Sequence, residues 1–124
     1  MTRLTLAILT ASLLAACATQ RAYEGPARSR GDIAVIEGGP AVNAGLPIVP
    51  IIRKIDDRVV HFGYSQVAVE PGTHRVLVDC VMQSAHTTTR HELSIEVYPG
   101  RRYRLVGESE AGNRRCGTVR VEER

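Results

Sequence analysis

A cysteine at the end of an apolar leader is the first residue of this chain with a specific chemical use. The chain begins with one basic residue, Arg3, continues with an apolar run at 4–13 and then reads Leu14-Ala15-Ala16-Cys17. A basic start, a short apolar run and small residues at the cleavage site are typical of a secretory signal peptide. The run is shorter than the ~20 residues that cross a bilayer as a helix. We therefore expect residues 1–16 to be removed, so that Cys17 becomes the first residue.

The residues that end at Cys17 resemble the lipobox of bacterial lipoproteins. In that family the cysteine thiol is diacylated, the chain is cut before it, and the freed amine is usually acylated too. The resemblance therefore implies palmitate or similar chains on Cys17, and two or more chains anchor a protein stably to a membrane. An ordinary signal peptide with an unrelated cysteine is the alternative. Ala18 follows instead of Asp, which by resemblance to the sorting of enteric lipoproteins favours the outer membrane, facing the periplasm.

Length and composition fit one small domain after the leader. Residues 17–124 are too few for two domains. The formal charge of the whole chain is +3, with one Phe, four Tyr and no Trp. A nucleic-acid binder needs a concentrated basic face, so we expect none here. Residues 18–31 contain Gly and Pro without periodicity, which predicts a tether. The expected organisation is a signal peptide at 1–16, a lipidated cysteine and flexible tether at 17–31, and a domain at 32–124.

Alternating apolar and polar residues predict that this domain is all-β. No helical period follows the leader, and short extended segments recur at roughly 8–12-residue spacing. Residues 83–89 and 108–115 are polar and are expected to be loops. Pro50 cannot donate a hydrogen bond to a neighbouring strand, so we expect the strand in this part of the chain to begin at Ile51. The expected fold is a small antiparallel β-sandwich or barrel. We expect about seven strands, drawn from eight candidate segments: 32–36, 51–55, 58–62, 66–70, 73–82, 93–97, 101–106 and 118–122.

The turns of this domain carry a second resemblance. Residues 69–76 (VEPGTHRV) resemble the hairpin of PEGA-type domains, and residues 99–103 (PGRRY) resemble the start of a strand in the same group. Those domains are small β-sandwiches in the transthyretin or carboxypeptidase-regulatory style. They often carry an Asp-Gly turn where this chain has 55–58, and here the Gly is missing. With residues 23–26, which are similar to an element that opens some small bacterial lipoproteins, the resemblance spans 23–106. It implies surface display or binding.

Two cysteines remain after lipidation, Cys80 and Cys116, in a compartment where disulfides persist. If joined, they close a loop of about 36 residues. By the chain-entropy relation, such a crosslink stabilises the folded state by roughly 3–4 kcal/mol, because it constrains the unfolded chain. Cys80 is in phase with its apolar neighbours, whereas Cys116 is out of phase with Val119. A bulge at Gly117 would restore the phase. We expect an intramolecular disulfide, with two separate buried thiols as the alternative.

No group of residues in the sequence predicts catalysis or a metal site. The chain has no Gly-x-Ser-x-Gly turn and no glycine-rich phosphate loop. Asp56-Asp57 fits a turn better than an acid–base pair. Of the four histidines, His86 and His91 are close in sequence, but residues five apart in a strand point to opposite faces. We therefore expect a protein that is not an enzyme and that needs no cofactor or metal, with its histidines satisfied or exposed on strands.

The one concentrated charged feature is a group of five arginines: Arg101, Arg102, Arg104, Arg114 and Arg115. If several of them share the outward face of a hairpin, they could bind an anionic partner, such as an anionic lipid, the phosphates of lipopolysaccharide or an acidic loop of an envelope protein. Nearby glutamates could neutralise them, however. The alternative, which the sequence favours, is a solvated sheet edge that its charges protect from aggregation.

Together these features predict a non-catalytic binding or structural module of the bacterial cell envelope. The lipid on Cys17 would anchor it to the periplasmic face of the outer membrane. The alternative is a small proteinaceous inhibitor of a periplasmic or host hydrolase, which a compact, disulfide-closed scaffold would suit. Its inserting loop would be the polar segment 83–89.

Overall fold

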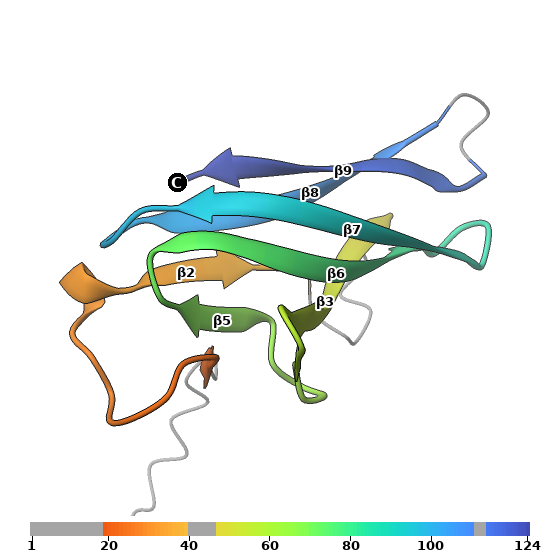
Figure 1. Ribbon diagram of the computed structural model, residues 1–124. Coiled ribbons are helices and arrows are strands. Elements are labelled where there is room, and N and C mark those ends of the chain that lie inside the picture. Colours follow the sequence, from red (N-terminus) through yellow and green to blue (C-terminus); the bar gives the residue numbers. More distant parts are fainter. Residues whose placement is uncertain (1–18, 40–46, 111–113) are drawn as a thin grey trace, which may run out of the picture.

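Two β-sheets make up the computed structural model, which describes residues 19–39, 47–110 and 114–124 (Figure 1). Cys17 and the expected signal peptide at 1–16 lie outside the described residues. The five-stranded sheet has, in spatial order, β1 (Thr19–Arg21), β5 (Gln66–Val69), β2 (Ala34–Glu37), β8 (Arg102–Ser109) and β9 (Cys116–Glu123). The four-stranded sheet has β4 (Arg58–Val59), β3 (Ile48–Ile55), β6 (Gly72–Met82) and β7 (Thr87–Val97). The prediction of an all-β sandwich is confirmed.

Helical structure is almost absent from the described part of the chain. It contains one short 3₁₀ turn, η1 (Arg30–Asp32). No helix among these residues is long and apolar enough to cross a membrane.

The core between the sheets consists mainly of branched aliphatic side chains. Ile36, Val67, Val76 and Val78 are fully buried there. In β6 the alternation read from the sequence places Val76, Val78 and Cys80 on this inner face. Branched side chains pack well on a pleated surface, so a chain with few aromatic rings still fills its core.

The sequence led us to expect a sandwich with antiparallel strands throughout, and the structure differs from this expectation. Most neighbouring strands are antiparallel, but β1 pairs with β5 and β2 pairs with β8 in parallel. A parallel pair needs a long connection rather than a tight turn. Between β2 and β8 the chain passes through all of the other sheet, so no local sequence signal fixes their relative direction.

Strand β3 begins at Ile48, earlier than the expected start at Ile51, and includes Pro50. Pro50 lies opposite Cys80 of β6. Its carbonyl accepts a hydrogen bond from the N–H of Gly39, 2.6 Å away, on the side away from β6. The neighbouring strand β4 covers β3 only near Ile55. Pro50 therefore occupies an edge position of the sheet, where proline is tolerated because no ladder donor is needed.

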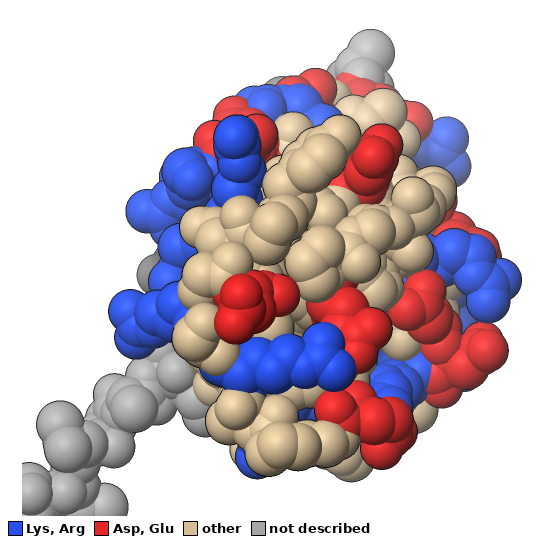
Figure 2. All heavy atoms as spheres, turned by 60° about the vertical axis from the view of Figure 1, so that its left-hand side comes forward, with Lys and Arg blue, Asp and Glu red and all other residues tan. Residues whose placement is uncertain are grey.

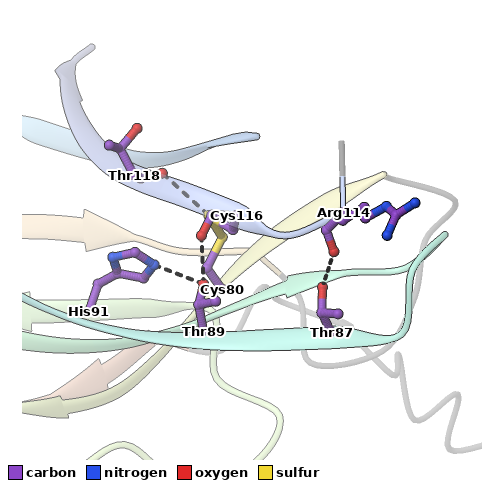
Figure 3. The surroundings of a disulfide bond; sticks show 7 residues. All are labelled: Cys80, Thr87, Thr89, His91, Arg114, Cys116 and Thr118. Atoms are coloured by element: carbon purple, nitrogen blue, oxygen red, sulfur yellow. Dashed lines mark hydrogen bonds between the residues drawn. A yellow bond between two sulfur atoms is a disulfide. The ribbon is translucent and has the colours of Figure 1, made fainter. Parts of the chain in front are cut away.

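The expected loop at 83–89 is a tighter turn than the sequence indicated, because Thr87 to Thr89 belong to β7. Two of them make hydrogen bonds to residues at or just before the start of β9, in the other sheet. The Thr87 hydroxyl donates to the carbonyl of Arg114 at 2.7 Å, and the Thr89 hydroxyl donates to the carbonyl of Cys116 at 2.9 Å (Figure 3). Polar residues that join two sheets have the same composition as a loop, which explains the error.

The expected tether is also corrected for its described part, residues 19–31. Thr19 to Arg21 form β1 at the edge of the five-stranded sheet. Tyr23 is buried against Ile33 and Ala68, on the face of this sheet that is turned away from the core. The Tyr23 hydroxyl accepts a hydrogen bond from the N–H of Arg28 at 3.2 Å. The segment packs as part of the domain because these apolar side chains cover that outer face.

Candidate functional site

A disulfide between Cys80 of β6 and Cys116 of β9 joins the two sheets, as predicted (Figure 3). Their Cα atoms are 6.0 Å apart, and both residues are buried. The bulge expected at Gly117 is present, since Ser109 lies opposite Cys116 and Glu108 lies opposite Thr118. The extra residue in β9 turns Cys116 toward the core. The disulfide and the two threonine hydrogen bonds close the edge of the sandwich formed by β7 and β9.

Gly107 of β8 makes room for this disulfide, a role that the sequence analysis missed. A Cβ atom at Gly107 would lie 2.6 Å from Cγ2 of Ile48 and 3.3 Å from Sγ of Cys116. The available signal was general: a glycine inside a strand often marks a close approach of another group. It does not say which group approaches.

Gln20 of β1 closes the opposite edge of the sandwich, formed by β1 and β4. Its Nε2 donates to the carbonyl of Val59 at 2.9 Å, and its Oε1 accepts from the N–H of His61 at 2.7 Å. One amide side chain thus satisfies an acceptor and a donor of the same loop. Sequence analysis could not identify this pair of bonds, because Gln20 fell in the presumed tether.

The five arginines predicted as an anionic-partner patch do not lie together. Arg101 and Arg102 are at the start of β8, Arg104 lies opposite Glu122 of β9, and Arg114 and Arg115 are at the far end of the β8–β9 ladder. The glutamates expected to neutralise them do pair with basic residues. These ion pairs join Arg101 to Glu123, Arg115 to Glu110, and Arg120 to Glu108 and Glu122.

A surface cavity of about 670 Å³ lies against the outer face of the five-stranded sheet, where Arg101 and Arg102 meet Arg30 of η1. The turn before β8 lies beside η1 because the N–H of Gly100 donates to the carbonyl of Ile33 at 2.7 Å. Gly100 has a φ of 77°, which favours glycine. Arg30 and Arg101, which are 71 positions apart in the sequence, thus both contribute to the basic wall of one cavity.

The rest of the cavity wall is partly polar and partly apolar. Thr19 and Gln66 provide the polar part, and Ile33 and Val35 provide the apolar part. The Thr19 hydroxyl and the Nη2 of Arg102 both donate to Oε1 of Gln66, at 3.2 and 3.3 Å. Among the described residues no carboxylate lines this cavity. Its chemistry therefore suits a ligand that has anionic oxygens and an apolar part.

The three guanidinium groups differ in how far they are already paired. A hydrogen bond from Arg101 to Glu123, reinforced by their opposite charges, raises the pKa of Arg101. Arg102 donates from Nε and Nη2 to Oε1 of Glu37, at 2.9 and 2.6 Å. No hydrogen bond or ion pair with another described residue engages the Arg30 side chain. Figure 2 shows that Lys and Arg gather along one side of the visible face and mix with Asp and Glu on the other.

Glu37 holds Arg102 in place from the same sheet. Its side chain is only 10% exposed and also accepts from Nη1 of Arg124 at 2.8 Å. Burial acts to raise the pKa of Glu37, but the hydrogen bonds from Arg102 and Arg124, with their charges, outweigh it and lower the pKa. The carboxylate therefore stays ionised and fixes the direction of Arg102.

The histidines do not converge on a metal site in the described part of the chain, where no group of three potential ligands lies close enough together. His74 is engaged on both sides, with Nδ1 2.8 Å from Oδ2 of Asp56 and Nε2 2.6 Å from the carbonyl oxygen of Glu70. His86 lies in the turn before β7 with a φ of 51°, so the strand rule applied to His86 and His91 does not hold.

Asp56 stabilises the turn between β3 and β4, as expected for a turn residue. Its Oδ1 accepts from the N–H of Arg75 at 3.0 Å. Burial acts to raise the pKa of Asp56, and the hydrogen bonds from His74 and from the Arg75 main chain lower it by more. With a φ of 53°, Asp56 adopts the left-handed conformation that the missing glycine would favour.

Comparison of the chain with protein-family models, with curated proteins and with solved structures finds no match. The lipoprotein and PEGA-type resemblances therefore stay predictions.

Proposed function

We propose that this protein is a lipid-anchored lipoprotein of the bacterial envelope, at the periplasmic face of the outer membrane, whose β-sandwich is a non-catalytic binding module for anionic ligands. The observation that carries the proposal is the cavity walled by Arg30, Arg101 and Arg102. Thr19, which also lines it, is the second residue after the cysteine of the lipobox. Anionic lipids and the phosphates of lipopolysaccharide are the ligands that a protein held at this surface would meet first.

The physical basis for anion binding is the unequal pairing of the three arginines. No other described residue pairs with the Arg30 side chain, and the fork of a guanidinium matches carboxylate and phosphate oxygens. Arg102 is held by Glu37, so a ligand would meet an oriented group with little entropy left to lose. The apolar part of the wall, Ile33 and Val35, would contact the start of an acyl chain.

Ligand binding is tested with the purified full-length protein and a short-chain phosphatidylglycerol below its micelle concentration. Phosphatidylcholine of the same chain length separates the headgroup from the acyl contribution. Arg30→Gln should weaken phosphatidylglycerol binding roughly tenfold, since a hydrogen bond to a charged group contributes about 1.5–3 kcal/mol. Arg75→Gln, on the other sheet, is the matched control and should bind as the wild type does. Equal binding of both lipids by the wild type would contradict the proposal.

Anchoring is tested separately through Cys17 and Ala18. Cys17→Ser should abolish palmitate incorporation and leave the protein out of the membrane fraction. Ala18→Asp should retain the lipoprotein in the inner membrane if the sorting habit of enteric lipoproteins applies. Palmitate labelling that persists in Cys17→Ser would exclude the lipobox assignment.

A hydrolase inhibitor is the second candidate function. The turn at 83–86 lies between the long strands β6 and β7 and projects at one end of the molecule (Figure 1). The disulfide anchors β6 nearby, so the turn is held on a rigid hairpin of the kind that could insert into an active site. Crosslinking in intact envelopes followed by purification distinguishes the two functions, because recovery of one hydrolase in stoichiometric amount would favour the inhibitor.

A further inference from the structure

The loop between β4 and β5 carries an exposed apolar tip. Among the described residues three large hydrophobic side chains are more than half exposed, and two of them, Val59 and Phe62, are in this region. Phe62 is the one phenylalanine of the chain and is 79% exposed. It lies in the turn where the N–H of Tyr64 donates to the carbonyl of His61. Burying a phenylalanine side chain is strongly favourable, so its position at the tip of a turn calls for an apolar partner.

This tip is held beside the first strand of the domain. The two hydrogen bonds of Gln20 fix the main chain at Val59 and at His61, on either side of Val60. Strands β1 and β5 are parallel, with Thr19 opposite Gln66. The chain therefore enters β1 at the same end of the sheet at which the loop with Phe62 enters β5. In Figure 1, β1, in red, and this loop, in yellow-green, both lie at the lower edge of the molecule.

The chain length before β1 limits how far this tip can be from a lipid on Cys17. Ala18 alone separates Cys17 from Thr19, and successive Cα atoms are about 3.8 Å apart. An acylated Cys17 is thus within about 8 Å of the start of β1. The tip held by Gln20 therefore lies beside a strand that begins within this distance of the anchor.

Charge around the tip also fits a membrane surface. Lys54 lies opposite Val59 in the β3–β4 ladder, and Arg21 ends β1. No hydrogen bond or ion pair with another described residue involves either of these side chains. Acidic side chains lie nearby as well, and each has a basic partner: Glu24 pairs with Arg58, and the three carboxylates that share a pocket with Lys54 pair with His74 or Arg75. Apolar side chains flanked by Lys and Arg are typical of segments that insert into the interface of an anionic bilayer.

We infer that Phe62 and Val59 insert into the lipid interface beside the acylated Cys17 and so fix the orientation of the domain on the membrane. This inference rests on the proposed lipid anchor and adds a second, protein contact to it. The acyl chains alone would leave the domain free to rotate, whereas the apolar tip determines which surfaces face the bilayer.

A single tryptophan tests this inference, because the chain has none. Full-length lipoprotein with Phe62→Trp is reconstituted in vesicles of phosphatidylethanolamine and phosphatidylglycerol, and its emission is compared with that of Tyr98→Trp. Tyr98 is the third exposed hydrophobic residue and is the matched control. It lies in the turn after β7, at the end of the sandwich where β5 ends rather than begins. A flotation assay of the same samples reports anchoring.

The expected result is a blue-shifted emission for Phe62→Trp that lipids brominated on their acyl chains quench, with Tyr98→Trp unshifted and unquenched. Vesicles that float the protein while Phe62→Trp keeps a water-like, unquenched emission overturn the inference and leave the anchor intact. A blue shift without quenching means a protein–protein contact at the tip and also overturns it. Failure to float, with no palmitate on Cys17, overturns the anchor and the inference together.

Discussion

Gly107 of β8 lies so close to Cys80 of β6 that a Cβ atom at position 107 would be 2.7 Å from Sγ of Cys80. The five-stranded and four-stranded sheets therefore lie close together where the disulfide joins them. The absence of a side chain at one position and the presence of a covalent bond at another are parts of the same packing arrangement.

This relationship predicts that Gly107→Ala destabilises the domain through the disulfide. Overpacking of this kind lowers the free energy of unfolding by about 1–3 kcal/mol. In a Cys80→Ala/Cys116→Ala background the same substitution should be less destabilising, since both nearby Sγ atoms are gone, although Ile48 remains. Urea unfolding of the four proteins, followed by circular dichroism, gives the coupling energy. Strictly additive effects would show that Gly107 and the disulfide are independent.

The disulfide itself should contribute much of the stability of the domain. Cys80→Ala and Cys116→Ala should each lower the free energy of unfolding by about 2–5 kcal/mol. Their combination should be little worse than either one alone, because both remove the same bond. Thiol labelling of denatured, unreduced Cys17→Ser protein should detect no free thiol. Two labelled thiols per chain would mean that the bond does not form.

Gln20→Ala should loosen the edge formed by β1 and β4. It removes two hydrogen bonds to the loop that carries Phe62, at about 0.5–1.5 kcal/mol each. Because the His61 N–H loses its acceptor, hydrogen exchange of this amide should accelerate. Thr19→Ala is the matched control on the same strand, since it removes only an exposed bond to Gln66. Unchanged exchange at His61 in Gln20→Ala would show that the loop is held by other contacts.

Periodicity was enough to predict the fold class, whereas the details that depend on distant partners were not predictable. The alternation of β6 and the phase error at Cys116 are local, so the sheet and the bulge at Gly117 followed from them. Thr87 and Tyr23 were misread, because a threonine that bonds to the other sheet and a tyrosine that covers an outer face look locally like parts of a loop or a tether.

The candidate site was predicted only in part. Arg101 and Arg102 do lie at a basic cavity, but Arg114 and Arg115 lie at the other end of their hairpin. The alternation of residues in the segment 101–106 places Arg102 and Arg104 on one face of a strand, but it does not say what lies beside that face. Arg30 lines the cavity because the hydrogen bond between Gly100 and Ile33 holds η1 beside the turn before β8. This contact joins segments far apart in the sequence, so no local pattern shows it.

The ion pairs of Glu37 with Arg102 and Arg124 should make stability depend on pH in the acid range. Hydrogen bonds from these arginines lower the pKa of Glu37 below its ordinary value of 4.5, against the opposing effect of burial. The folded state therefore binds this proton less tightly than the unfolded state does. The resulting stabilisation is fully present above the unfolded pKa and is lost as the pH falls through the folded pKa.

Glu37→Gln removes this contribution and isolates it from those of Asp56 and Asp79, whose pKa values are also lowered and which remain in both proteins. Near pH 7 the variant should be less stable by about 1–3 kcal/mol, because the bonds from Arg102 and Arg124 lose their charged acceptor. As the pH is lowered below about 4, the difference between the two proteins should shrink, since the wild-type carboxyl becomes neutral as well. Urea unfolding across this range measures the difference directly. A difference that stays constant with pH would mean that the carboxylate charge contributes nothing and that Glu37 acts only through its shape.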